Sequence, residues 1–109
     1  MSGGGGIFYP MDVSAFERSL TGSQPPPGLS PLLQALWHER GGDWTRAHEI
    51  AQDIETADAA LVHAYLHRRE GDPSNAAYWY GQAGAPVARG DLDDEWRVLV
   101  TRLLAGSAR

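Results

Sequence analysis

HAYLHRREGDPSNAAYWYGQAG, residues 63–84, contains a turn from which the rest of the fold can be worked out. Glycine favours the end of a helix, aspartate caps the start of the next one, and proline suits a first helical position. Gly71, Asp72 and Pro73 stand in that order. We therefore expect one helix to end at Gly71 and a second to run from Pro73 to about Ala83, where Gly84 stops it, so that the two make a helical hairpin.

A second hairpin of the same design lies 29 residues earlier in the chain. Shifting the chain by this amount places Gly42 and Asp43 on Gly71 and Asp72. The shift also aligns small residues, Ala35 with Ala64 and Ala47 with Ala76, at positions where two helix backbones must approach closely. It aligns His38 with His67 as well. The sequence thus predicts two antiparallel hairpins stacked side by side.

Caps and apolar spacing predict helices in the rest of the chain as well. Ser14 and Glu17 match a capping box, so a first helix of about two turns is expected there. A last helix starts after Asp91 and has Trp96 and Leu99 on its apolar stripe. Further caps are expected at Ser30, Asp43 and Thr56. No segment alternates like a strand, so the predicted class is all-α: about five or six helices in a small right-handed solenoid or bundle.

Two segments rich in glycine or proline lie outside the predicted helices. SGGGG at residues 2–6 belongs to a lead, residues 1–11, that we expect to be flexible. GSQPPPG at residues 22–28 is expected to be an extended linker, because it is too rich in proline and glycine for a helix or a central strand. Residues 12–109 then form a single helical domain, since 109 residues have room for one core.

The repeated hairpin resembles the tetratricopeptide repeat, whose paired helices use small residues and a turn glycine at these relative places. The resemblance covers residues 32–85, about half of the chain. The period is shorter than the usual 34 residues, and the first helices lack the usual tryptophan and leucine-glycine signature. The chain is also similar to a group of small bacterial proteins that share GDWTRAHEIAQ, residues 42–52, and the stretch at 63–84. No activity comes with that similarity.

Composition excludes several classes of function. Nine basic against fourteen acidic residues give a net charge of −5, which disfavours binding to nucleic acid. The absence of cysteine rules out a disulfide framework and a thiolate metal site, and it suits a reducing compartment. No apolar run is long enough to span a membrane, and the first residues lack the regions of a signal peptide. A cytoplasmic location is the resulting expectation.

Three histidines are candidate metal ligands. His63 and His67 are four residues apart on a predicted helix, so both side chains emerge on one face, as a two-histidine site requires. His48 on the preceding helix is a candidate third ligand, and Glu49 beside it is a candidate carboxylate ligand or base. The alternative is that His67, like His38, lies near a helix C-terminus and interacts with exposed carbonyl groups there. This alternative is the favoured interpretation, and binding of a divalent metal ion is the rival one.

A binding surface is the preferred functional hypothesis. In the repeat alignment Trp79 and Tyr80 fall on apolar positions and are expected in the core, whereas Tyr78 falls on Glu49 and should point outward. Helical repeats bind along a concave face, and aromatic and arginine side chains anchor interfaces. The expected groove contains His63, His67, Arg68, Asn75 and Tyr78. Its occupant would be a protein or peptide partner, or a second copy of the chain in a homodimer.

Other patterns that suggest catalysis have simpler explanations. Asp43 and Asp72 are repeat equivalents, but each stands where an N-cap is required, so they are not paired catalytic carboxylates. The acidic residues 91–95 are interpreted as a helix start with solvated charge. Phosphate-loop and serine-nucleophile motifs are absent. No catalytic residue is assigned. An interaction module is the preferred expectation, and a metal-binding protein or metal-dependent enzyme that uses His48, His63 and His67 is the alternative.

Overall fold

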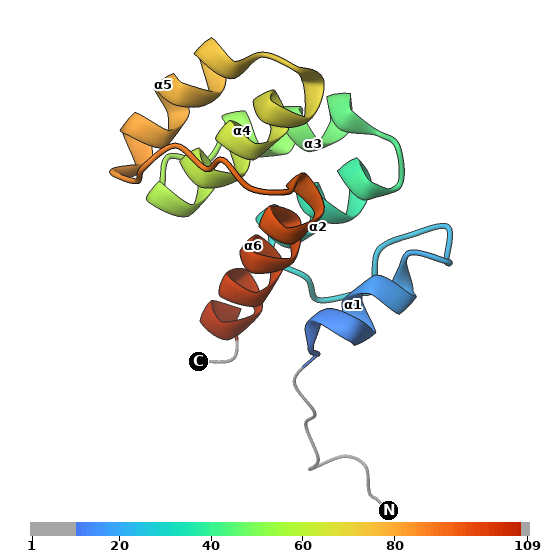
Figure 1. The fold of residues 1–109 in the computed structure, drawn as a ribbon. Helices are drawn as coiled ribbons and strands as arrows, with labels where there is room; N and C mark the ends of the chain where they lie inside the picture. Colours follow the sequence, from blue (N-terminus) through green and yellow to red (C-terminus); the bar gives the residue numbers. More distant parts are fainter. Residues whose placement is uncertain (1–10, 108–109) are drawn as a thin grey trace, which may run out of the picture.

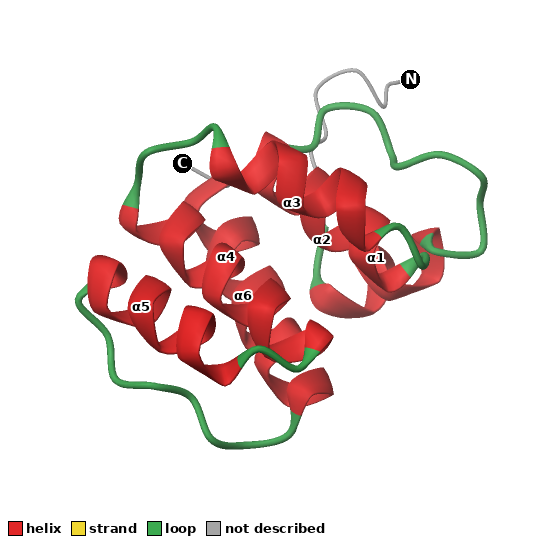
Figure 2. Cartoon of the chain, turned by 90° about the horizontal axis from the view of Figure 1, so that it is seen from above, coloured by secondary structure: helices red, strands yellow, loops and turns green. Residues whose placement is uncertain are grey.

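The computed structural model describes residues 11–107 and consists of six helices joined by loops (Figures 1 and 2). The helices are α1 (Val13–Ser19), α2 (Pro31–Arg40), α3 (Trp44–Gln52), α4 (Ala57–Glu70), α5 (Pro73–Ala83) and α6 (Leu92–Ser107). These residues contain no strand, so the predicted all-α class is confirmed. None of the six helices is both long and apolar enough to cross a membrane. Except for Met11, the glycine-rich lead lies outside the described residues.

The helix starts follow the predicted caps with one exception. The side chains of Ser30, Asp43, Thr56 and Asp72 each accept a hydrogen bond from the backbone N–H three residues ahead. The expected capping box at Ser14 is wrong. Asp12 caps α1 instead, with its carboxylate oxygen 2.8 Å from the backbone nitrogen of Ala15, so the helix begins before Ser14 and includes it. The proline-rich residues 22–28 form a loop without helix, as predicted.

The two hairpins, α2–α3 and α4–α5, have the same turn. Gly42 and Gly71 have φ angles of 99° and 87°, a left-handed conformation that favours glycine. The next residue in each turn, Asp43 or Asp72, donates its backbone N–H to a histidine carbonyl oxygen 2.8 Å away. These carbonyls belong to His38 and His67, which the 29-residue shift also aligns. All four aligned alanines are buried: Ala35, Ala47, Ala64 and Ala76.

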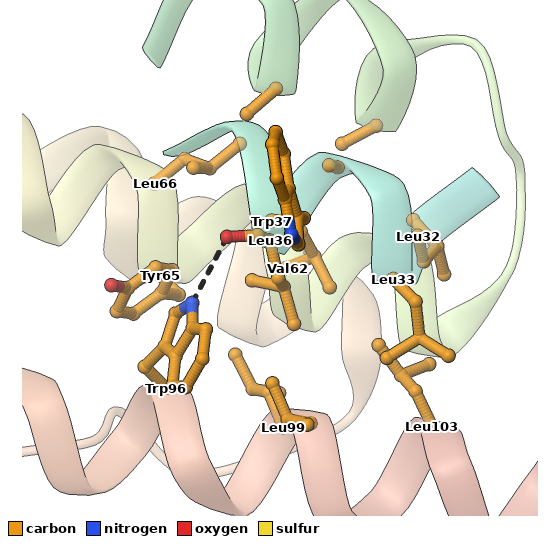
Figure 3. Close-up of a cluster of buried hydrophobic side chains, with 14 of the residues drawn as sticks. Leu32, Leu33, Leu36, Trp37, Val62, Tyr65, Leu66, Trp96, Leu99 and Leu103 are labelled. Carbon is orange, nitrogen blue, oxygen red and sulfur yellow. Dashed lines mark hydrogen bonds between the residues drawn. The ribbon is translucent and has the colours of Figure 1, made fainter. Parts of the chain in front are cut away.

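Helix α6 crosses the first helices of both hairpins, α2 and α4, and also contacts α1 (Figure 1). Trp96 is fully buried there, and its indole N–H donates to the carbonyl oxygen of Leu36 at 3.1 Å (Figure 3). Phe16 of α1 lies against the same ring, with centroids 5.6 Å apart. The face that the first helices would offer to a ligand is therefore covered by the chain's own last helix.

Two arginines on α4 bind the start of α6 and the loop before it through hydrogen bonds. Arg68 donates to Glu95 at 2.5 Å and to the backbone oxygen of Gly90 at 2.8 Å, and Tyr80 of α5 donates to the same carboxylate. Arg69 donates to Asp93 at 2.9 Å. The prediction that residues 91–95 carry solvated charge is thus wrong for Glu95. Its side chain is only 11% exposed, because two donors from neighbouring helices reach it.

Candidate metal centre

The three candidate histidines meet where α3 faces α4. His48 comes from α3, and His63 and His67 come from successive turns of α4. One ring nitrogen of each lies within 4.8 Å of the others. The Nε2 atoms of His48 and His63 are 2.8 Å apart, and these two rings are nearly perpendicular, at 82°. The packing of α3 against α4, one helix from each hairpin, places His48 opposite the pair on α4, a placement that no sequence rule supplies.

Two tryptophans hold the imidazole rings in position. Trp44 is stacked on His48, with centroids 4.9 Å apart and planes at 12°. The Trp44 indole N–H donates to the backbone oxygen of Leu66 at 2.7 Å, which ties α3 to α4. Trp79 of α5 is stacked on His63 at 3.9 Å and 14°. Trp79 is only half-buried, and its main partner is a histidine, so its predicted place in the core is confirmed only in part.

A carboxylate orients the third histidine. The Oε2 atom of Glu70 lies 2.7 Å from Nδ1 of His67, which leaves Nε2 of that ring for another partner. Histidine ligands of metal ions commonly donate their other ring N–H to a carboxylate in this way. Sequence reasoning proposed Glu49 for the carboxylate role, but Glu49 is exposed on α3 and does not belong to the cluster. The overlooked clue was the spacing of His67 and Glu70, three residues apart on one helix face.

Burial and the neighbouring imidazoles favour the neutral forms of His63 and His48. His63 is buried, and desolvation, followed by the neighbouring His48 and His67, lowers its pKa to about 4. Desolvation and the nearby His67 also lower the pKa of His48. A metal ion binds the neutral imidazole, so protons compete weakly for His63 at neutral pH. His63 and His48 can therefore offer nitrogen lone pairs to a cation without first losing protons.

The five residues of the expected binding groove lie in different surroundings. His63 and His67 face α3, whereas the guanidinium of Arg68 is occupied by Glu95 of α6. Asn75 is exposed in the first turn of α5, where its backbone N–H is capped by Asp72. Tyr78 is 57% exposed, as expected, and its ring lies edge-on against Trp79. The structure thus brings the histidines together but directs Arg68 away from them.

Fold and site together define a small all-α protein with a largely buried three-histidine cluster between its two hairpins. No protein-family model, curated protein or solved structure matches the chain. Any statement about function consequently rests on the geometry of the side chains.

Proposed function

We propose that the protein binds a divalent transition metal ion, with zinc as the leading candidate, through His48, His63 and His67. The observation that carries this proposal is the convergence of three ring nitrogens from two helices within 4.8 Å. In a tetrahedral zinc site with Zn–N distances of about 2.0–2.1 Å, ligand nitrogens are about 3.4 Å apart. The 2.8 Å between His48 and His63 and the 4.8 Å limit bracket that value, so small ring movements suffice.

The ligand set also indicates the kind of metal and its chemistry. Imidazole nitrogens suit Zn²⁺, Cu²⁺ and Ni²⁺, whereas Mg²⁺ and Ca²⁺ prefer oxygen ligands. Three neutral ligands leave the full double charge on the ion, and a fourth position stays open to water or another molecule. Sites of this type act as Lewis acids and lower the pKa of bound water towards 7. Glu70 supports the set by fixing the tautomer of His67.

The proposal is tested by metal analysis of protein purified without a histidine tag. We expect about one zinc ion per chain after exposure to zinc and gel filtration, and loss of that zinc in the His63→Ala/His67→Ala double variant. His38→Ala is the matched control, because His38 is the repeat equivalent of His67 but lies outside the cluster. It should retain the metal.

The alternative explanation of the cluster is packing alone. In that case the wild-type protein would contain no stoichiometric metal, and the double variant would only be less stable in chemical denaturation. That combination would overturn the proposal.

We propose an interaction surface on the outer side of α5 as a second candidate function. The observation that favours it is the exposure of Tyr78, one of three large hydrophobic side chains that the described residues leave exposed. Aromatic residues of this kind anchor protein interfaces. A second copy of the chain is the first partner to test, by sedimentation of wild type and Tyr78→Ser. A monomer at every concentration for both proteins would exclude the homodimer.

A further inference from the structure

A cleft of about 480 Å³ runs beside the histidine cluster. It follows α4 from its N-terminus towards His63, with the end of α3 on one side and α5 on the other. Its lining residues come from all three helices and from the loop before α4, and they include Gln52, His63, Trp79 and Gln82. His63 therefore belongs both to the cleft and to the proposed metal site.

We propose that this cleft binds a small amide-bearing molecule that reaches the metal ion beside His63. The inference rests on the proposed metal site, because three protein ligands leave a coordination position for an outside molecule. The volume lies in the range of small-molecule sites, which are commonly 300–1,000 Å³. His63 and Trp79 form the end of the cleft nearest the cluster, where their rings are stacked at 3.9 Å.

The lining selects the class of ligand. Gln52 and Gln82 approach from α3 and α5, and each carboxamide can both donate and accept a hydrogen bond. An amide presents the complementary pair of one N–H and one carbonyl oxygen. No lysine or arginine lines the cleft, so a nucleotide or another polyanion would find no counter-charge on the protein.

Small side chains provide the space and the apolar wall. Ala59 and Ala60 on α4 are both buried, and their short side chains leave room that larger residues would fill. Ala51 and Ile54 add apolar surface from the end of α3. The cleft accordingly fits a compact ligand with an amide group and a short apolar or aromatic substituent.

The test uses benzohydroxamic acid, which combines an amide-like group, an aromatic ring and oxygen atoms that bind zinc. Calorimetry on the zinc-loaded protein should show saturable binding with one site. Gln82→Trp places a large side chain in the cleft and should weaken binding at least tenfold, with zinc content unchanged. Ser74→Trp is the control on the same helix, at an exposed position that does not line the cleft. It should bind the probe like the wild type.

A second pair of substitutions tests the ligand class. Gln52→Leu/Gln82→Leu keeps the approximate volume but removes both carboxamides, so we expect binding to weaken about tenfold. Unchanged affinity in this variant would overturn the amide assignment, and unchanged affinity in Gln82→Trp would overturn the cleft as the binding site. Zinc content is measured on every sample. Absence of zinc from the wild type contradicts the metal site itself, whereas zinc without cleft-dependent binding contradicts only this further inference.

Discussion

Helix α4 has two polar faces, and they differ in how their charges are balanced. Towards α6, Arg68 and Arg69 each reach a carboxylate of that helix, at 2.5 and 2.9 Å. Towards α3, His63 and His67 meet a third imidazole, and Glu70 on α4 itself is the carboxylate bonded there. The same helix therefore presents a face that the protein neutralises by itself and a face where three bases converge.

The difference is consistent with the proposal that the α6 side of α4 contributes to stability and the α3 side binds a metal ion. On the α6 side, Glu39 is buried and accepts from the Tyr65 hydroxyl at 2.8 Å, with Arg69 3.3 Å away. Burial still raises the pKa of Glu39, although Tyr65 and Arg69 oppose that rise. On the α3 side, three imidazoles converge, and apart from the contact between His48 and His63 and the bond of His67 to Glu70, no other group donates to them or accepts from them among the described residues. Under the proposed function, a bound cation would accept the nitrogen lone pairs of these rings.

The largest loss of stability is expected from Arg69→Ala, on the side of α4 that faces α6. This change leaves Glu39 buried without its arginine, and breaking a buried ion pair costs about 3–5 kcal/mol of the free energy of unfolding. Chemical denaturation measures the loss. Arg97→Ala is the control, because Arg97 pairs with Glu17 and Asp94 at an exposed site and should cost less than about 1 kcal/mol. Equal losses would mean that the two kinds of ion pair do not differ.

Zinc should stabilise the protein only through the histidine cluster, and the change in the free energy of unfolding should be smaller than that of Arg69→Ala. At a free concentration of 100 times the dissociation constant, a ligand that binds only the folded state adds about 2.7 kcal/mol to the free energy of unfolding. The gain should vanish in His63→Ala/His67→Ala and persist in Arg69→Ala, provided that variant folds. Magnesium should produce no gain, because it prefers oxygen ligands. Thermal unfolding with and without each ion provides the measurement, and equal stabilisation by both ions would contradict a nitrogen site.

The two faces also differ in how far the sequence predicts them. Local signals place the caps at Asp43 and Asp72 and the turn glycines, because each depends on residues within one turn of the chain. The 29-residue repeat adds the pairing of helices into hairpins. The ion pair of Arg68 with Glu95 could not be predicted, since it depends on the angle at which α6 crosses α4. Such long-range geometry is absent from spacing and propensity.

The histidine site could be predicted in part, less fully than the helix caps but better than the ion pair of Arg68 with Glu95. The spacing of His63 and His67 predicts a shared face, and the hairpin model makes His48 a candidate on the neighbouring helix. The apolar pattern predicts only burial for Trp79 and assigns no role to Trp44, so it does not reveal the stacking of Trp79 on His63 or of Trp44 on His48. Aromatic residues at a half-buried position satisfy an apolar pattern whether their neighbour is an alkyl chain or an imidazole. Only the rotation of the helices decides between the two.

Acid should lower the free energy of unfolding through His63, in protein kept free of metal by a chelator. Folding lowers the pKa of His63 from 6.5 to about 4, so between these values the unfolded chain binds more protons than the folded one. Stability is therefore complete above about pH 6.5 and falls as the pH drops, by about 2 kcal/mol between pH 7 and pH 5. Denaturation at several pH values measures the slope.

His63→Phe is the control for this acid effect. Phenylalanine can retain the stack on Trp79 but takes up no proton, so the slope should flatten. Glu39 has the opposite effect on stability. Its pKa is raised in the folded protein, so the folded state binds more protons than the unfolded state and becomes more stable as the pH falls. An identical slope in His63→Phe and wild type would assign the acid effect to residues outside the cluster.

The smallest expected effect concerns Glu70, the carboxylate on the histidine face. It is partly exposed and accepts from His67, so its loss should cost little stability in metal-free protein. Carboxylates that orient a ligating histidine typically contribute 10–100-fold in metal affinity. Because Glu70 is exposed to solvent, we expect the lower end, about tenfold weaker zinc binding for Glu70→Ala. Glu70→Gln keeps a side-chain oxygen as an acceptor and should lie between that variant and wild type. Competition with a chromophoric chelator gives the affinities, and three equal values would show that Glu70 is a surface charge without a role in orienting His67.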